Sequence, residues 1–429
     1  MTSSAAMVSA GLAAAALLAC GGDDTTAPTP CDATVVGDVC TIAGSGHSGY
    51  DGDDEDARLA SMSLPQDTLH GADGTMYVLD WNNHRIRKVG ADGVMRHVAG
   101  RGELGGTLDD PANDDFNHPT AMIFDPSNSK LIVAAWHNSK LRTVDLATGA
   151  VVDTCGDGRR AYFGDGGPAA GATLDLPASI ALAPNGELYV MDQANQVIRA
   201  IDRAGTGTIR RVAGSCVIDA PPPAGPGACA EGVAPIACVP AGSGKTTCGA
   251  VATCGSPCTP GYAGDDGPAL DLRMAQPFGQ SADPGGRLLF VGADLYFADP
   301  TNAIIRKLDA AGNVTRVAGK APVAGVAQTG HTGDGGPALD ATLFNPVDLA
   351  LDTDGSIYVS DVYNHCVRRF TPGGTMSTVV GTCGAAGYTG DGGPALTAQL
   401  KRPYGIEIHG DFLYIADTGN NVIRAVRLR

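Results

Sequence analysis

The stretch Asp192-Gln-Ala-Asn195-Gln-Val-Ile198-Arg199 decides the fold, because close variants of it occur six times in the 429-residue chain. The six copies begin at Asp80, Ala135, Asp192, Asp299, Asp361 and Asp417. The second copy has lost its aspartate. Self-similarity of this kind is the signature of a repeat architecture, so each copy is expected to mark one structural unit.

A second marker, Gly-Asp-Gly-Gly-Pro-Ala or a variant, precedes the copies. It is intact at residues 164–169, 333–338 and 390–395, altered at 264–269 and 52–57, and reduced to Pro111-Ala112 before the second copy. From its proline position to the aspartate position of the motif, the interval is 24 residues in four copies and 23 in the sixth. The fourth interval is 31 residues, where Asp283–Arg287 is expected to lengthen a hairpin.

Each unit is predicted to contain four short strands. In the third copy the expected strands are residues 178–183, 187–191, 197–201 and 209–213, with a tight turn at Asn185-Gly186. A four-stranded sheet cannot bury both faces alone, and radial stacking around a central channel solves that problem. The sequence therefore predicts an all-β fold, a β-propeller of four-stranded blades.

The ends of the chain predict how the ring closes. The last copy stops 12 residues after Asp417 and so lacks its fourth strand, whereas residues 39–44 match the fourth strand at residues 315–319. An N-terminal strand that completes the last blade hides both edges, which predicts six blades over residues 36–429. Residues 215–260 carry neither marker and are expected to form a disulfide-rich insert between blades 3 and 4.

The first 20 residues are typical of a signal peptide, because a short apolar run ends in Leu17-Leu18-Ala19-Cys20. This end resembles the lipobox of bacterial lipoproteins, in which the cysteine carries the lipid. An ordinary secretory signal is the alternative, since no Lys or Arg precedes the apolar run. Residues 21–35 are expected to be a flexible tether. The expected location is the cell envelope, anchored at the outer membrane through Cys20, or outside the cell.

Twelve cysteines fit an oxidising compartment, and without Cys20 an odd number remains, so one thiol stays free or pairs between chains. Six of them are disulfide candidates in the insert: Cys216, Cys229, Cys238, Cys248, Cys254 and Cys258. Their connectivity does not follow from the sequence. The net charge of −17 argues against a nucleic-acid partner and allows at most a cation or a cationic partner. A monomer that meets a membrane only through its lipid is expected.

The succession of Gly-Asp-Gly-Gly-Pro-Ala, Leu-Tyr-Val-x-Asp-x-x-Asn, Ile-Arg and Val-Ala-Gly resembles the NHL-repeat family, in particular the propellers of exported bacterial proteins and of teneurins. The resemblance implies a six-bladed propeller that acts as a binding or scaffold module for a protein or a small ligand. Fold does not fix function. A metal-dependent lyase or hydrolase with its site at the central channel is the alternative, although the sequence shows no catalytic constellation.

Both markers are expected in loops on one face of the propeller, here called the marker face. Its marker carboxylates are Asp53, Asp165, Asp265, Asp334 and Asp391. They are candidate ligands for Ca²⁺, which prefers several oxygen donors. The alternative is that each carboxylate accepts hydrogen bonds from the amides of its own turn. The motif aspartates and asparagines are expected to cap loop backbone, and the motif arginines to pair between blades or face solvent.

Deviations between copies are more informative about binding than the repeat itself. Trp81 and Trp136 are the only tryptophans and occupy the same loop position in adjacent blades, with His84 and His137 nearby. Tyr363 lies one position later in the fifth copy. Exposed aromatic side chains beside polar groups suit a ligand or partner surface. Local packing between neighbouring loops is the alternative for these residues.

Overall fold

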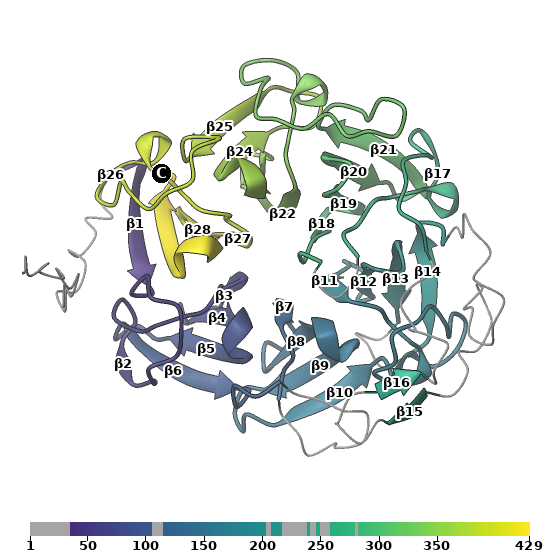
Figure 1. Cartoon of the computed structure of the whole chain (residues 1–429), viewed down its shortest axis with the longest axis horizontal. Helices are drawn as coiled ribbons and strands as arrows, with labels where there is room; N and C mark the ends of the chain where they lie inside the picture. Colours follow the sequence, from purple (N-terminus) through teal and green to yellow (C-terminus); the bar gives the residue numbers. More distant parts are fainter. Residues whose placement is uncertain are drawn as a thin grey trace, which may run out of the picture.

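The computed structural model describes residues 35–104, 115–202, 207–216, 238–240, 246–248, 258–278 and 282–429, and the call of a lipidated Cys20 lies outside them. In Figure 1 the described strands form a ring of six sheets around a common centre. Each sheet is antiparallel, and its strands follow chain order from the centre to the rim. The prediction of a six-bladed, all-β propeller is confirmed.

The first three blades use consecutive strands. Blade 1 consists of β3 (Asp67–His70), β4 (Met76–Asp80), β5 (Arg85–Val89) and β6 (Val94–Ala99). Blade 2 consists of β7 (Pro119–Phe124), β8 (Lys130–Ala135), β9 (Lys140–Asp145) and β10 (Val151–Cys155). Blade 3 consists of β11 (Pro177–Leu182), β12 (Leu188–Asp192), β13 (Val197–Ile201) and β14 (Ile209–Ala213). The strands of blade 3 match the predicted ranges within one residue.

The remaining blades repeat this plan. Blade 4 consists of β18 (Leu288–Val291), β19 (Asp294–Asp299), β20 (Ile304–Leu308) and β21 (Asn313–Ala318). Blade 5 consists of β22 (Pro346–Leu351), β23 (Ile357–Asp361), β24 (Cys366–Phe370) and β25 (Met376–Val380). Blade 6 consists of β27 (Ile406–His409), β28 (Phe412–Asp417), β29 (Val422–Arg427) and β1 (Asp38–Ala43).

Short elements mark the two sequence markers. Four motif loops contain a 3-10 turn: η1 (Trp81–Asn83), η2 (Trp136–Asn138), η7 (Val362–Asn364) and η9 (Thr418–Asn420). Another four follow the proline of the second marker: η3 (Ala169–Gly171), η5 (Ala269–Asp271), η6 (Ala338–Asp340) and η8 (Ala395–Thr397). Two-residue strands β2 (Glu55–Asp56), β17 (Gly267–Pro268) and β26 (Gly393–Pro394) extend three outer strands. The second marker is therefore docked on the rim of its blade.

The N-terminal strand closes the ring as predicted. β1 pairs antiparallel with β29, with Val39 opposite Val426 and Cys40 opposite Ala425, so strands from both ends of the described chain share one sheet. Figure 1 shows β1 beside the C-terminal strands of blade 6. This pairing leaves neither terminal strand with an open edge toward the ring, which is how propellers avoid edge-to-edge association.

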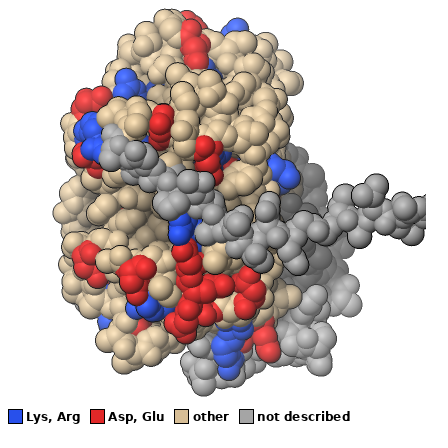
Figure 2. All heavy atoms as spheres, turned by 90° about the vertical axis from the view of Figure 1, so that its left-hand side faces the viewer, with Lys and Arg blue, Asp and Glu red and all other residues tan. Residues whose placement is uncertain are grey.

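Apolar side chains from adjacent blades form the core. Between blades 2 and 3, for example, Ile132 and Leu141 pack with Leu174, Ile180 and Val190, all less than 5% exposed. Similar clusters lie between the other neighbours, so each blade buries its second face against the next one. On the side of the ring shown in Figure 2, Asp and Glu outnumber Lys and Arg, in keeping with the negative net charge.

The extra residues of the fourth copy are not in a hairpin, so that prediction was wrong. The hairpin between β18 and β19 turns tightly at Gly292 and Ala293. Asp283–Arg287 precedes the innermost strand instead and lies near the axis of the ring, where every other blade has a shorter connection. The insert keeps its predicted place between β14 and blade 4. Its described part is held by a Cys216–Cys258 disulfide and contains the paired strands β15 (Cys238–Pro240) and β16 (Thr246–Cys248).

Candidate functional site

The repeat motif forms a buried polar network within each unit, and blade 3 shows it most completely. One oxygen of the Asp192 carboxylate accepts a hydrogen bond from the Asp175 amide at 2.7 Å. The other oxygen accepts from Asn195 Nδ2 at 2.8 Å and from Arg199 Nη1 at 3.3 Å. Arg199 is fully buried and also donates to two backbone carbonyls of the preceding loop. The aspartate and asparagine therefore fix loop backbone, as predicted.

The motif arginines also hold the marker carboxylates. The pairs are Arg87–Asp53, Arg199–Asp165, Arg306–Asp265, Arg368–Asp334 and Arg424–Asp391. In three of them a tyrosine hydroxyl donates to the same aspartate: Tyr50, Tyr162 and Tyr262. Each carboxylate is thus engaged by a guanidinium of its own repeat unit rather than gathered around a common point. This arrangement favours a framework role over the Ca²⁺ hypothesis.

The arginines depart from the prediction in two respects. Five of them are completely buried instead of facing solvent, and their ion pairs lie within one repeat unit instead of between blades. Burial also acts on their partners, because a desolvated carboxylate loses hydration energy. It raises the pKa of Asp80 to about 6 and the pKa of Asp192, Asp361 and Asp417 to about 7.

Blade 2 departs from this network because Ala135 replaces the motif aspartate. Its arginine, Arg142, donates from Nε to Asp153 at 2.8 Å and from Nη1 to the Asp115 carbonyl at 2.7 Å. Asp153 lies on the outer strand and is one-third exposed. Loss of the buried aspartate is therefore accompanied by a partner nearer the surface.

Four of the five predicted binding residues come together between blades 1 and 2, joined by one that the sequence reasoning missed. We call this set the aromatic–histidine cluster: Trp81, His84, His118, Trp136 and His137. Ring centroids are 4.2 Å apart for Trp81 and His118, 4.2 Å for Trp136 and His137, and 6.3 Å for the two indoles. The cluster lies on the marker face, where η1 and η2 follow β4 and β8.

His84 takes part in an inter-blade contact that other blades share. Its Nδ1 accepts a hydrogen bond from the backbone N–H of His118 at 3.2 Å. His365 accepts in the same way from the Arg402 amide, and Asn421 from the Leu64 amide. The donor precedes a proline in each case, and His118 has the positive φ of +56° seen at equivalent positions. Local packing, the alternative considered for these residues, therefore describes His84.

The rest of the cluster contains polar ring atoms without partners. Nε1 of Trp81, Nε1 of Trp136 and Nε2 of His137 are buried and make no hydrogen bond within the described part of the chain. An unsatisfied buried polar atom costs about 1–3 kcal/mol. Burial lowers the pKa of His118 to about 3 and that of His137 to about 4, so both imidazoles are neutral at physiological pH. The cluster therefore offers aromatic faces and uncharged hydrogen-bonding groups.

Tyr363, the fifth predicted residue, lies in a different group on the same face. Its hydroxyl donates to the Asp283 carboxylate, which also accepts from Arg402 Nη2 at 2.8 Å. The Gly285 amide donates to Gln193 at 3.2 Å. The segment that lengthens the fourth copy thus contacts blades 3, 5 and 6. The adjacent Ala282 packs in the same apolar cluster as Trp81 and Trp136.

Arg287, at the end of this segment, forms an ion pair across the axis of the ring. Its Nη1 lies 2.8 Å from Asp67 Oδ2 in blade 1, and its Nη2 donates to the Thr120 carbonyl of blade 2 at 2.6 Å. Asp348 of blade 5 accepts from the Ile406 amide of blade 6 at 2.9 Å and interacts electrostatically with Arg287. Burial raises the pKa of Asp67 to about 7. These groups tie the inner strands together.

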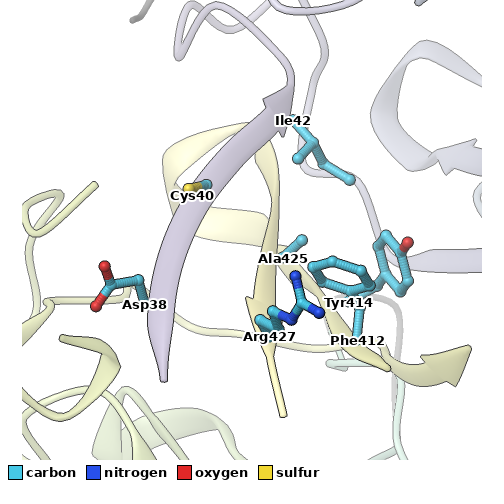
Figure 3. A pocket seen from close by; sticks show the side chains of 7 residues that line it. All are labelled: Asp38, Cys40, Ile42, Phe412, Tyr414, Ala425 and Arg427. Carbon is cyan, nitrogen blue, oxygen red and sulfur yellow. The ribbon is translucent and has the colours of Figure 1, made fainter. Parts of the chain in front are cut away.

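A separate pocket opens on blade 6. It has a volume of about 190 Å³, and its walls include Ile42, Phe412, Tyr414 and Arg427 from three neighbouring strands (Figure 3). The lining is mostly apolar, with charged groups from Asp38 and Arg427. None of the predicted site residues lines this pocket, so it was missed by the sequence reasoning.

The cysteines follow the expected oxidised pattern in part. Cys216 pairs with Cys258 and Cys366 with Cys383, and Cys40 is also disulfide-bonded. Cys229 and Cys254 lie outside the described residues, as do the side chains of Cys238 and Cys248. Cys155 is a free, buried thiol, and burial raises its pKa to about 12. Such a thiol is unreactive as a nucleophile.

Six four-stranded blades, closed by the N-terminal strand, define a six-bladed β-propeller. Within the described residues, no helix is long and apolar enough to span a membrane. The family model described as "NHL repeat" matches residues 345–370. Together with the six related repeats, this match identifies the chain as a member of the NHL-repeat β-propellers, and the predicted family is confirmed.

Curated relatives are similar over most of this chain. The chloroplastic protein SUPPRESSOR OF QUENCHING 1 of Arabidopsis thaliana is 25% identical, over 87% of this chain and 31% of the relative. Teneurin-1 of Gallus gallus is 24% identical, over 90% of this chain and 13% of the relative. The chain thus spans less than a third of the length of these relatives.

Two solved structures share the fold. A protein of unknown function from Bacteroides thetaiotaomicron superposes with a TM-score of 0.60 at 16% identity, covering 91% of this chain and 75% of that one. An auxiliary nutrient binding protein from the same organism has a TM-score of 0.55 at 14% identity, covering 90% and 75%. At this level of identity the likeness concerns the fold alone.

Proposed function

We propose that this chain is an exported binding module that takes an uncharged, polar ligand at the aromatic–histidine cluster. The observation that carries the proposal is the set of three buried ring nitrogens without partners, on Trp81, Trp136 and His137. A ligand oxygen that reached these groups would remove a cost of about 1–3 kcal/mol for each orphaned atom. Trp81, His118 and His137 are partly exposed, so the cluster is open to solvent on that side.

The chemistry of the cluster favours a carbohydrate-like ligand. Indole rings present a large apolar face together with an N–H donor, which matches a molecule with an apolar face and oxygen acceptors. The lowered pKa of His118 and His137 leaves no positive charge to attract an anion. The likeness in fold to a solved protein named as nutrient binding supports a small ligand over a scaffold role.

The test is a binding screen of neutral mono- and oligosaccharides with the full-length chain, followed by titration calorimetry. Trp81→Phe keeps an aromatic ring and removes only the N–H, so loss of one neutral hydrogen bond is expected to weaken binding about 2- to 10-fold. Tyr363→Phe is the matched control and is expected to leave the affinity unchanged. Equal affinity for the wild type and Trp81→Phe, or a loss on Tyr363→Phe alone, would contradict the proposed site.

Export through a lipobox-like signal is part of the proposal, supported by Leu17-Leu18-Ala19-Cys20 and by the disulfides of the propeller. Lipidation of Cys20 is expected to place the protein in the membrane fraction of a bacterial host. A Cys20→Ser variant should be released in soluble form. If that variant stays membrane-bound, lipid attachment at Cys20 is refuted.

A metal-dependent lyase or hydrolase is the second candidate function, and one observation favours it: His70, Glu407 and His409 form a group of metal-ligand side chains. Turnover of any substrate that disappears on chelation and returns with metal would support the enzyme. A chain that binds saccharides with the same affinity in the presence of a chelator would support the binding module.

A further inference from the structure

His70, Glu407 and His409 meet at the seam between the first and last blades. His70 ends β3, the innermost strand of blade 1, and Glu407 and His409 belong to β27, the innermost strand of blade 6. Both strands begin at the marker face, where Ser63 is bound by Asp80, and run away from it. The three side chains therefore lie toward the opposite face from the aromatic–histidine cluster, and they come together only because the ring closes.

Two of the three side chains are held in place by hydrogen bonds. Glu407 Oε1 accepts from the His70 amide at 2.8 Å, and Glu407 Oε2 lies 2.7 Å from His70 Nδ1. The His70 ring is wedged between His409, stacked at 4.7 Å, and Tyr414 at 4.0 Å. The side chain of His70 is only 5% exposed. An imidazole and a carboxylate are thus fixed side by side before any ligand arrives.

His409 completes the group from the solvent side. It is exposed, and its ring makes no hydrogen bond among the described residues, whereas a structural clasp between blades would need only His70 and Glu407. One donor atom from each of the three residues lies within 4.8 Å of the others. Two donors bound to one zinc ion at about 2.1 Å each can be at most about 4.2 Å apart, so small side-chain rotations would bring all three into range.

A pocket adjoins the group. Tyr414 contacts the His70 ring on one side and lines the pocket of about 190 Å³ on blade 6 with the other strands shown in Figure 3. Metal centres with three protein ligands leave an open position for water or a small ligand, and an adjoining cavity gives such a ligand room. This neighbourhood is independent of the donor geometry and points to a ligand at the same seam.

From these observations we infer that His70, Glu407 and His409 bind a divalent transition-metal ion of the zinc class. Two imidazoles and one carboxylate are a donor set that zinc accepts in proteins, whereas Ca²⁺ and Mg²⁺ prefer oxygen donors throughout. The ion would replace the proton shared between His70 Nδ1 and Glu407, so binding releases a proton and weakens at low pH. The inference does not rest on the proposed saccharide site.

The experiment titrates Zn²⁺ into full-length, chelator-treated protein and follows binding by calorimetry, with Co²⁺ absorption as a second readout. One equivalent is expected to bind, and His409→Ala and Glu407→Gln are each expected to lower the affinity at least 10-fold. His47→Ala, an exposed histidine outside the group, is the matched control and should bind like the wild type. Thermal unfolding of each variant without metal verifies that the propeller is intact.

Three outcomes would overturn the inference. The first is the absence of saturable Zn²⁺ binding, and the second is equal affinity for the wild type and His409→Ala, which keeps the His70–Glu407 pair. The third is an affinity that His118→Ala removes and His409→Ala does not, which would place the ion in the aromatic–histidine cluster. Saccharide binding by metal-free protein separates failure of this inference from failure of the proposed function.

Discussion

Replacing Arg199 by methionine tests whether the repeated motif is a structural framework. The substitution removes a fully buried guanidinium that joins Asp165, Asp192 and two backbone carbonyls. Hydrogen bonds from a charged donor stabilise by about 1.5–3 kcal/mol each, and breaking a buried ion pair costs about 3–5 kcal/mol. Because the pKa of Asp192 is already about 7, this carboxyl can take up a proton and limit the penalty. We expect a loss of about 3–5 kcal/mol in the free energy of unfolding.

The matched control is Arg142→Met in blade 2, where Ala135 has replaced the buried aspartate. Arg142 pairs with a one-third exposed carboxylate, so its loss leaves no buried motif aspartate behind and should cost about 1–2 kcal/mol. Urea unfolding followed by far-UV circular dichroism measures both variants. Equal destabilisation by the two substitutions, or a stable Arg199→Met protein, would refute the framework interpretation of the motif.

Three further predictions concern the disulfide and the axis of the ring. Removing the Cys366–Cys383 bridge by a double serine substitution should cost about 3 kcal/mol of unfolding free energy in urea titration, because it closes a loop with a sequence separation of 17 residues. Arg287→Met should destabilise by about 3–5 kcal/mol at pH 7 and by less at pH 5, since Asp67 and Asp348 then face each other unpaired and protonate; a loss that is the same at both pH values would argue against this arrangement. The pKa of Asp67 is raised to about 7, so the native chain holds a proton that the unfolded chain releases. Its stabilising contribution is complete below about pH 4 and disappears as the pH rises through 7, by up to about 1.4 kcal/mol per pH unit, and Asp67→Asn should flatten that dependence in denaturation midpoints.

The period of the repeat explains why most of the fold could be predicted. A constant interval between two markers fixes strand register in every blade, and the missing fourth strand after Asp417 points to the closing strand at the N-terminus. The extra length of the fourth copy was visible as well, but an interval does not say where in a blade the added residues lie. Contacts of Asp283 and Arg287 with other blades placed them near the axis.

Contacts made by ring closure could not be predicted in the same way. His118 lies outside both markers and joins the tryptophans because the blade 2 entry packs on the blade 1 loop. An alignment of the residues that precede Pro119 and its equivalents would have shown it as a deviating copy. His70 and Glu407 are 337 positions apart in the chain and belong to no marker, so only the seam between the first and last blades reveals them.

Amide hydrogen exchange of β1, followed by mass spectrometry on the intact chain, tests the central claim that one closed ring supports both proposed sites. If β1 closes blade 6, its amides should be protected to the same extent as those of its partner β29, because both open only when the ring opens. The result that would contradict the account is complete exchange of residues 38–43 at the earliest time point while β28 and β29 remain protected.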